Sequence, residues 1–156
     1  MWCTVRSVTA LDVEHTIREL GLAPHPEGGF YRETFRSNAA TLIYYLLRAG
    51  EFSAFHRVLG RDETWHRYAG GPLVLHVVHS DGRYEARRLD AARHHALVPA
   101  DAWQAAEAES EAVLVGCTVS PAFDFAAFEM PKRAELRTLL ADTQLPSAVL
   151  ERLTRD

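Results

Sequence analysis

Hydrophobic residues near the start of the chain follow the spacing of a helix. Thr9 followed by Asp12 resembles a capping box, and Gly21 supplies the positive φ that commonly ends a helix. Two prolines and a glycine pair interrupt residues 22–29, which favours a loop there. We therefore predict a short N-terminal helix followed by a loop. The apolar residues that recur at helical spacing are Val13, Ile17 and Leu20.

From residue 30 to residue 119 the hydrophobic pattern changes to that of strands. Asp81-Gly82 lies between two β-rich runs and is a strong hairpin signal. Short runs of this kind at spacings of roughly 8–12 residues are typical of a sandwich or barrel. The fold class that we predict is therefore all-β. The expected strands cover residues 30–35, 41–47, 52–58, 64–68, 73–79, 84–89, 96–98 and 112–119.

The helical pattern returns after Pro131, which we place at the first position of a helix. No linker, internal repeat or low-complexity segment divides the 156 residues. We expect a single domain over residues 1–156, with short helices at the N- and C-termini. The apolar residues that support helix in the tail are Leu136, Leu139, Leu140, Val149, Leu150 and Leu153.

Composition and charge indicate an ordinary globular protein with a small-molecule function. The chain is 47% apolar and 24% charged, with a net charge of −4. Its basic residues are scattered among acids, which argues against nucleic acid or an anionic membrane as a partner. The longest clean apolar run, residues 42–47, is far shorter than the roughly 20 residues that span a bilayer. Without a secretory signal, and with Cys3 and Cys117 expected as free thiols, we predict a cytoplasmic protein.

One histidine and one glutamate stand at a spacing that can carry chemistry. From Gly50 the chain runs through five residues to His56, one residue to Val58, four residues to Glu63 and six residues to Gly70. On a regular strand His56 shares a face with the apolar residues at positions 52, 54 and 58. Burial as an ordinary core histidine explains this placement as well as a functional role does.

This spacing resembles the first motif of the cupin superfamily, with Val58 where the second histidine belongs. Residues 99–104 resemble a damaged second motif, in which Asp101 replaces a glycine and Gln104 replaces the ligand histidine. The chain is similar, from about residue 20 to 128, to the small cupin family known as DUF985. The segments that carry this resemblance are residues 26–34, 56–58, 62–70, 98–99, 103–106, 115–118 and 123–125.

The resemblance implies a jelly-roll β-barrel whose interior holds a small-molecule ligand. It also implies a homodimer, with residues 30–35 close to the partner subunit. An edge strand is an easy place to add a neighbour's strand.

The metal ligands of a cupin are largely missing. A usual site offers three imidazoles and a carboxylate, whereas Val58 cannot coordinate and Gln104 offers only an amide oxygen. His66 lies on the opposite strand face from Glu63 and reaches the site only across a bulge. We therefore expect no cofactor; a metal, if bound, is held by His56, Glu63 and Gln104.

Without a metal, a histidine–carboxylate dyad is a workable base for removing a proton next to a carbonyl. We expect Glu63 to hold the tautomer of His56 and a tyrosine, Tyr31, Tyr44 or Tyr68, to supply the acid. The predicted catalytic residues are His56, Glu63 and Tyr44. Packing explains each tyrosine and tryptophan equally well, and a surface ion pair explains Glu27 with Arg32. The predicted substrate-binding residues are Glu27, Arg32, Trp65, His66, Tyr68, Trp103 and Gln104.

The function that follows is a metal-free isomerase or epimerase acting on a sugar-nucleotide-like or keto substrate. Two alternatives stay open. One is a metal-dependent dioxygenase or lyase using His56 and Glu63. The other is a non-catalytic small-ligand-binding protein that retains only the pocket.

Overall fold

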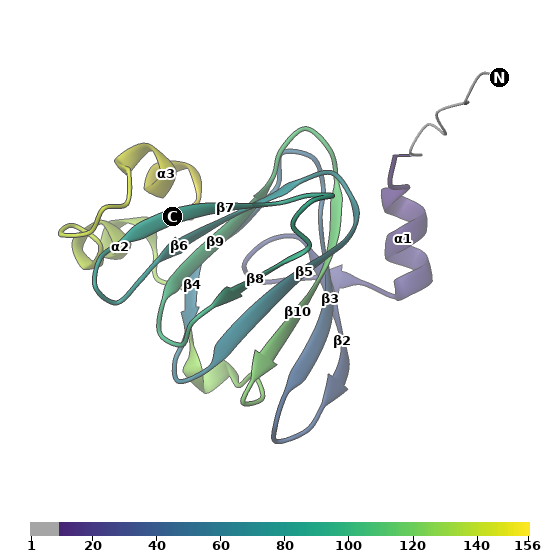
Figure 1. Ribbon diagram of the computed structural model, residues 1–156, viewed down its shortest axis with the longest axis horizontal. Helices are drawn as coiled ribbons and strands as arrows, with labels where there is room; N and C mark the ends of the chain where they lie inside the picture. The colour runs from purple at the N-terminus through teal and green to yellow at the C-terminus, as the bar shows by residue number, and fades with distance from the viewer. Residues whose placement is uncertain (1–9) are drawn as a thin grey trace.

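The computed structural model describes residues 10–156, so Cys3 and Thr9 lie outside it (Figure 1). Two antiparallel sheets dominate the molecule and confirm the all-β fold class. One sheet has the strand order β1-β2-β3-β10-β5-β8 and the other β11-β4-β9-β6-β7. The strands are β1 Ala23–Pro24, β2 Phe30–Arg36, β3 Thr41–Leu47, β4 Phe52–Val58, β5 Asp62–Gly70, β6 Leu73–Val78, β7 Tyr84–Leu89, β8 His95–Val98, β9 Trp103–Ala108, β10 Val113–Ser120 and β11 Phe128–Glu129.

Short helices occur near both ends, as the sequence predicts. Helix α1 (Val13–Leu20) is capped by Asp12 itself, whose carboxylate accepts from the His15 amide at 3.0 Å, and ends at Gly21 with φ 62°. Near the C-terminus, α2 spans Arg133–Leu139 and α3 spans Ser147–Arg152. The prediction for Pro131 was wrong, because Lys132 is the N-cap of α2 and Pro131 precedes it. Within residues 10–156, no helix is long and apolar enough to cross a bilayer.

Strand β9 has no counterpart among the predicted strands. Its sequence, WQAAEA, lacks the β-branched residues by which the other strands are recognised. In the structure it lies in the middle of its sheet, paired with both β4 and β6. Alanine at these positions lets the second sheet pack closely against the first.

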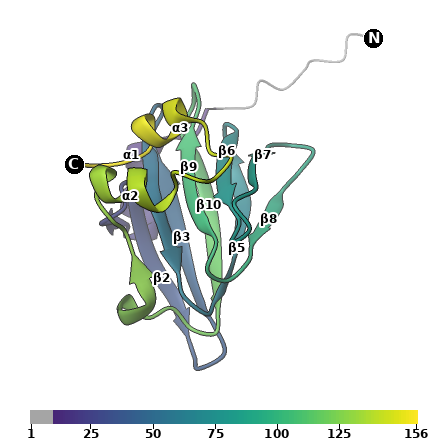
Figure 2. The ribbon, with the colours of Figure 1, turned by 90° about the vertical axis from the view of Figure 1, so that its left-hand side faces the viewer.

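Two apolar clusters lie on the two faces of the five-stranded sheet. The inner cluster fills part of the space between the sheets and includes Tyr45, Trp65 and Leu75. The outer cluster joins Phe55 to Leu136 and Leu153 of the C-terminal region. Figures 1 and 2 show α2 and α3 beside β6 and β9, so the C-terminal segment covers this outer face.

A β-bulge in β4 decides which of its side chains point inward. Ser53 pairs with Ala106 and His56 pairs with Gln104, so β4 has one more residue than β9 in this interval. The bulge frees the Ala54 amide to donate to the Glu27 carbonyl at 2.8 Å and the Phe55 amide to donate to the Leu153 carbonyl at 2.9 Å. The predicted regular alternation was therefore wrong. Ser53 and His56 face inward, and Phe55 packs against the C-terminal helices.

Candidate functional site

A cavity of about 480 Å³ opens between the two sheets, large enough for a small molecule. Titratable side chains line its inner end, aliphatic and aromatic side chains line most of the rest, and Arg32, Glu33 and Arg36 also contribute to the lining. This distribution resembles that of small-molecule sites, which place a few polar groups in a mostly apolar wall. The titratable residues are His25, Glu27, His56, Glu63 and Cys117; among the apolar residues are Ile43, Val58, Val119, Phe123, Phe125 and Phe128.

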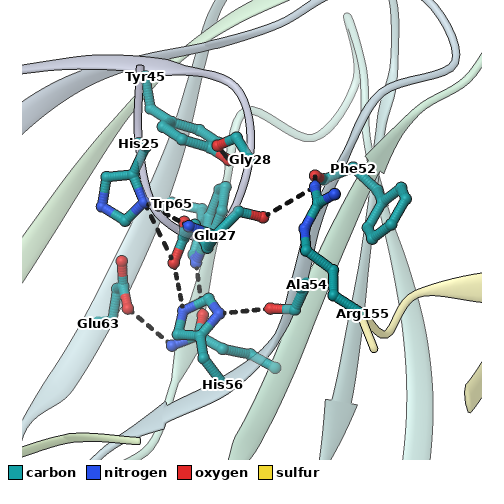
Figure 3. A network of polar contacts seen from close by, with 11 residues as sticks. His25, Glu27, Gly28, Tyr45, Phe52, Ala54, His56, Glu63, Trp65 and Arg155 are labelled. Carbon is teal, nitrogen blue, oxygen red and sulfur yellow. Dashed lines mark hydrogen bonds and ion pairs between the residues drawn. The ribbon is translucent and has the colours of Figure 1, made fainter. Parts of the chain in front are cut away.

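His56 and Glu27 form the central pair of the site (Figure 3). Nδ1 of His56 lies 2.8 Å from the Ala54 carbonyl oxygen, and since a carbonyl only accepts, Nδ1 carries the hydrogen. Nε2 is then left with its lone pair and lies 3.2 Å from Oε2 of Glu27. Burial, which raises the pKa of Glu27 and lowers that of His56, favours the neutral pair in which the Glu27 carboxyl holds the proton. The expectation that Glu63 holds the tautomer of His56 was wrong, because Ala54 does so.

The loop before β2 presses Glu27 into the protein. Gly28 has φ 108°, and a Cβ there would lie 2.4 Å from the Phe52 carbonyl oxygen. The Tyr45 hydroxyl donates to the Gly28 carbonyl oxygen. Nη2 of Arg155, near the C-terminus, lies 3.4 Å from the carbonyl oxygens of both Glu27 and Phe52 (Figure 3). The alternative of a surface ion pair between Glu27 and Arg32 was wrong, because these contacts leave Glu27 only 5% exposed.

Gly28→Ala is expected to lower the free energy of unfolding by roughly 2–4 kcal/mol, because the new Cβ meets backbone and the positive φ is unfavourable. Urea denaturation measures the loss. Gly50→Ala is the matched control, since Gly50 also has a positive φ of 76° but nothing within 4 Å of the added Cβ. Its cost is expected to be about 1 kcal/mol. Equal losses in the two variants would contradict the close packing of the Glu27 loop.

Glu63 is held by a second chain of hydrogen bonds. Its Oε2 accepts from Nε2 of Gln104 at 2.7 Å. Oε1 of Gln104 in turn accepts from the indole of Trp65 at 2.8 Å, which fixes the orientation of the amide. Gln104 and Trp65 are predicted above to bind substrate, but both are fully committed to this chain and neither lines the cavity. They orient Glu63.

Burial controls the protonation of the site. Loss of solvation raises the pKa of Glu27 to about 8, and the nearby hydroxyls of Ser53 and Tyr45 offset only part of this effect. Loss of solvation likewise raises the pKa of Glu63 to about 7, against the opposing influence of His56. The same cause lowers the pKa of His56, and it lowers the pKa of His25 to about 4. Near neutral pH the two imidazoles are therefore neutral, Glu27 mostly keeps its proton and Glu63 is partly ionised.

Several predicted site residues lie away from the cavity. Tyr44 is on the outer face of its sheet, 6.1 Å from Tyr68 between ring centroids, and His66 stacks on the same Tyr68. Trp103 packs in the outer cluster with Arg57 over its ring. The structure thus separates all four from the cavity, and the assignment of Tyr44 as the catalytic acid does not agree with its position. Inward-facing Tyr45 is the residue next to it.

Two other predicted residues border the cavity. Arg32 contributes to its rim, but its Nη1 donates to the Leu20 carbonyl oxygen at 3.2 Å. Tyr31 lines the wall, and its ring lies edge-on to that of His25 at 4.5 Å. Tyr31 is thus the one of the three candidate tyrosines that can reach a bound molecule.

Sequence reasoning missed His25, the position of Cys117 and the three phenylalanines. His25 is adjacent to the Pro26-Glu27 motif, which was a usable signal. Cys117 was expected to be a buried inert thiol; it is buried and unpaired, but it also lines the cavity beside Glu63. Burial raises the pKa of its thiol well above the usual value, which keeps it protonated. The phenylalanines come from residues 123–128, a segment without a periodic pattern, in which Phe125 begins a short 3-10 helix and Phe128 begins β11.

The residues do not fit a cupin metal centre. Val58 lines the cavity without a donor atom, and the amide oxygen of Gln104 is occupied by Trp65. Of the two ring nitrogens of His56, one is bound to Ala54 and the other faces Glu27. Over residues 10–156, no three His, Cys, Asp or Glu side chains are grouped so as to hold a metal ion. The set His56, Glu63 and Gln104 therefore lacks the donors for such a site.

Two antiparallel sheets enclosing a ligand-sized cavity define a protein of the cupin, or double-stranded β-helix, class. The chain belongs to the cupin superfamily family DUF985, whose model, described as "Cupin superfamily (DUF985)", matches residues 14–131. No curated protein matches the sequence.

Solved structures agree with this membership. A hypothetical protein from Leishmania major is 30% identical, with a TM-score of 0.84 over 92% of this chain and 99% of that one. Protein SO0799 from Shewanella oneidensis is 33% identical, with a TM-score of 0.84 over 93% and 98% of the two chains. KdgF from Halomonas sp. is 16% identical, with a TM-score of 0.58 over 70% and 94%, and shares the fold alone.

Proposed function

We propose that the protein is a cupin enzyme that isomerises or epimerises a small keto compound by proton transfer without a metal. The observation that carries this proposal is the grouping of proton-transfer residues in one cavity. Glu63, with a pKa of about 7, suits a general base at neutral pH. Beside it the Glu27–His56 pair holds a proton that it can donate.

In the proposed step, the Glu63 carboxylate takes a proton from the carbon next to the substrate carbonyl. The electrons of the broken C–H bond form a carbon–carbon double bond, and the carbonyl oxygen takes the proton of Glu27 to give an enol. Glu63 then returns its proton to the same carbon or, in a β,γ-unsaturated substrate, to the γ-carbon of the dienol as the double bond moves into conjugation. Glu27 recovers its own proton from the enol hydroxyl. For epimerisation, Tyr31 on the cavity wall is the candidate donor to the opposite face of the carbon.

The direct test is incorporation of solvent deuterium into keto compounds, followed by NMR. We expect exchange catalysed by the wild-type protein and strongly reduced in Glu27→Gln. The matched control is Glu107→Gln. Glu107 also pairs with a buried histidine, His76, at 2.8 Å, but outside the cavity. Tight binding across the panel with no exchange would contradict the proposal and favour a non-catalytic binding protein.

The same proposal predicts that the purified protein carries far less than one transition-metal ion per chain, because the donor set is incomplete. Elemental analysis by mass spectrometry measures this content. Near-stoichiometric metal that is lost in His56→Ala would contradict the prediction and favour the metal-dependent dioxygenase or lyase.

We also propose that the protein is a cytoplasmic homodimer. The two-residue strand β1 pairs only with Phe30 and Tyr31, so the rest of β2 has an unpaired edge within the described residues. An unpaired edge of this kind accepts a neighbour's strand. Light scattering at micromolar concentration is expected to give twice the chain mass of 17.5 kDa. A monomer mass would contradict the proposed dimer.

A further inference from the structure

We infer that the substrate is an uncharged carbonyl compound with a planar, aromatic or unsaturated body, and not a sugar nucleotide or an oxo acid. This inference rests on the proposed function and names its substrate class. Two observations carry it: an aromatic wall beside His56, and the absence, among residues 10–156, of an arginine or lysine at the inner end of the cavity.

Three phenylalanines form the aromatic wall. The ring centroids of Phe123 and Phe125 are 5.0 Å apart, and both rings meet Phe128 edge-on at 5.8 and 6.2 Å. Phe128 in turn lies 5.4 Å from the ring of His56, so the wall runs from the reacting end to the mouth. Phe125 is 60% exposed although it lines the cavity. A flat apolar body gains both buried area and ring–ring contact against this surface.

The cations around the cavity are already engaged. Arg36 makes two parallel hydrogen bonds to the Glu33 carboxylate at 2.8 and 2.7 Å and a third to the Phe123 carbonyl oxygen at 2.8 Å. Arg32 pairs in register with outward-facing Tyr44 and donates to Leu20. A diphosphate or carboxylate would have to displace Glu33 to gain an ion pair with Arg36, and Arg32 is exposed at the rim rather than directed at the inner end.

The inner end also disfavours a negative charge. Its two buried carboxyls, Glu27 and Glu63, have only neutral imidazoles beside them. An anion placed there would repel any ionised carboxylate in a poorly solvated space. A ketone oxygen, in contrast, can accept the hydrogen of Glu27. The cavity thus selects a polar but uncharged group at one end and a flat apolar body at the other.

Calorimetric titrations of the wild-type protein with four compounds separate the effect of a planar body from the effect of a negative charge. We expect 1-phenylpropan-2-one to bind most tightly. Its non-planar analogue 1-cyclohexylpropan-2-one should bind roughly threefold to tenfold more weakly. The anion phenylpyruvate should bind at least about tenfold more weakly, and UDP-glucose should give no heat of binding. Tighter binding of either anion than of the neutral ketone, or no binding of the neutral ketone at 10 mM, would overturn the inference.

Substitutions test the two observations separately. Glu33→Gln removes the charged partner of Arg36 and should strengthen phenylpyruvate binding by about tenfold. The affinity for 1-phenylpropan-2-one should stay the same. Phe128→Leu and Phe125→Leu should each weaken the binding of 1-phenylpropan-2-one by roughly threefold to tenfold. Phe35→Leu is the control, because Phe35 is 51% exposed and lies outside the cavity. Unchanged binding in both cavity variants would overturn the aromatic wall as a binding surface.

Binding and proton exchange separate this inference from the proposed function. Binding in the expected order without deuterium exchange would retain the substrate class and remove the proposed reaction. Exchange into an anionic compound or into one without a planar body, lost in Glu63→Gln, would retain the reaction and overturn the substrate class.

Discussion

Glu63→Gln is expected to slow deuterium exchange into a bound keto compound by about 10²–10⁴-fold, the usual contribution of a general base. The substituted amide oxygen can still accept from Gln104, so the chain to Trp65 persists and the cavity keeps its shape. What is lost is the capacity to take a proton. The reduction should therefore appear in kcat, while substrate affinity changes little.

The control for this rate effect is again Glu107→Gln, which alters a partly buried glutamate–histidine pair away from the cavity. Its exchange rate should match that of the wild-type protein. Exchange at the wild-type rate in Glu63→Gln would show that the base is another residue. A rise in KM together with a fall in thermal stability would instead indicate a structural role for the carboxyl.

The fold could be predicted largely because its strands carry a simple signal. Each predicted strand from residue 30 onward corresponds to an observed one, since β-branched and aromatic residues alternate there. Strand β9 was missed because an alanine-rich strand gives no such alternation. The bulge in β4 was missed for a different reason. It depends on the Glu27 carbonyl and the Leu153 carbonyl, which come from distant parts of the chain.

The site could be predicted only in part. His56 and Glu63 followed from their spacing, and the structure places both on the cavity wall. The burial of Glu27 could not be foreseen, because it results from a loop pressed between Tyr45 and Arg155. Residue type alone does not distinguish a rim carboxylate from a buried one. The direct partner of His56 is therefore a residue whose importance appears only in three dimensions.

The same buried carboxyls predict an unusual dependence of stability on pH. An unfolded glutamate ionises near pH 4.5, whereas Glu27 keeps its proton to about pH 8 and Glu63 to about pH 7 in the folded protein. Over the interval between these values the folded state binds more protons, so stability falls as the pH rises, by about 1.4 kcal/mol per pH unit for each carboxyl. His25 and His56 have lowered pKa values, and their contribution is instead lost as the pH falls below 6.5.

The histidines contribute equally in the wild-type protein and in Glu27→Gln, so the difference between the two isolates the effect of Glu27 between pH 6.5 and 8. Over this interval Glu27→Gln should gain roughly 2 kcal/mol in unfolding free energy relative to the wild-type protein, because an amide cannot ionise. Urea denaturation at a series of pH values measures the change. Glu107→Gln should keep the wild-type slope, since hydrogen bonds from Arg152 and His76 hold the pKa of that carboxyl below its usual value. The same slope in Glu27→Gln as in the wild-type protein would mean that Glu27 is already ionised at pH 6.5, and that the proton of the pair lies on His56.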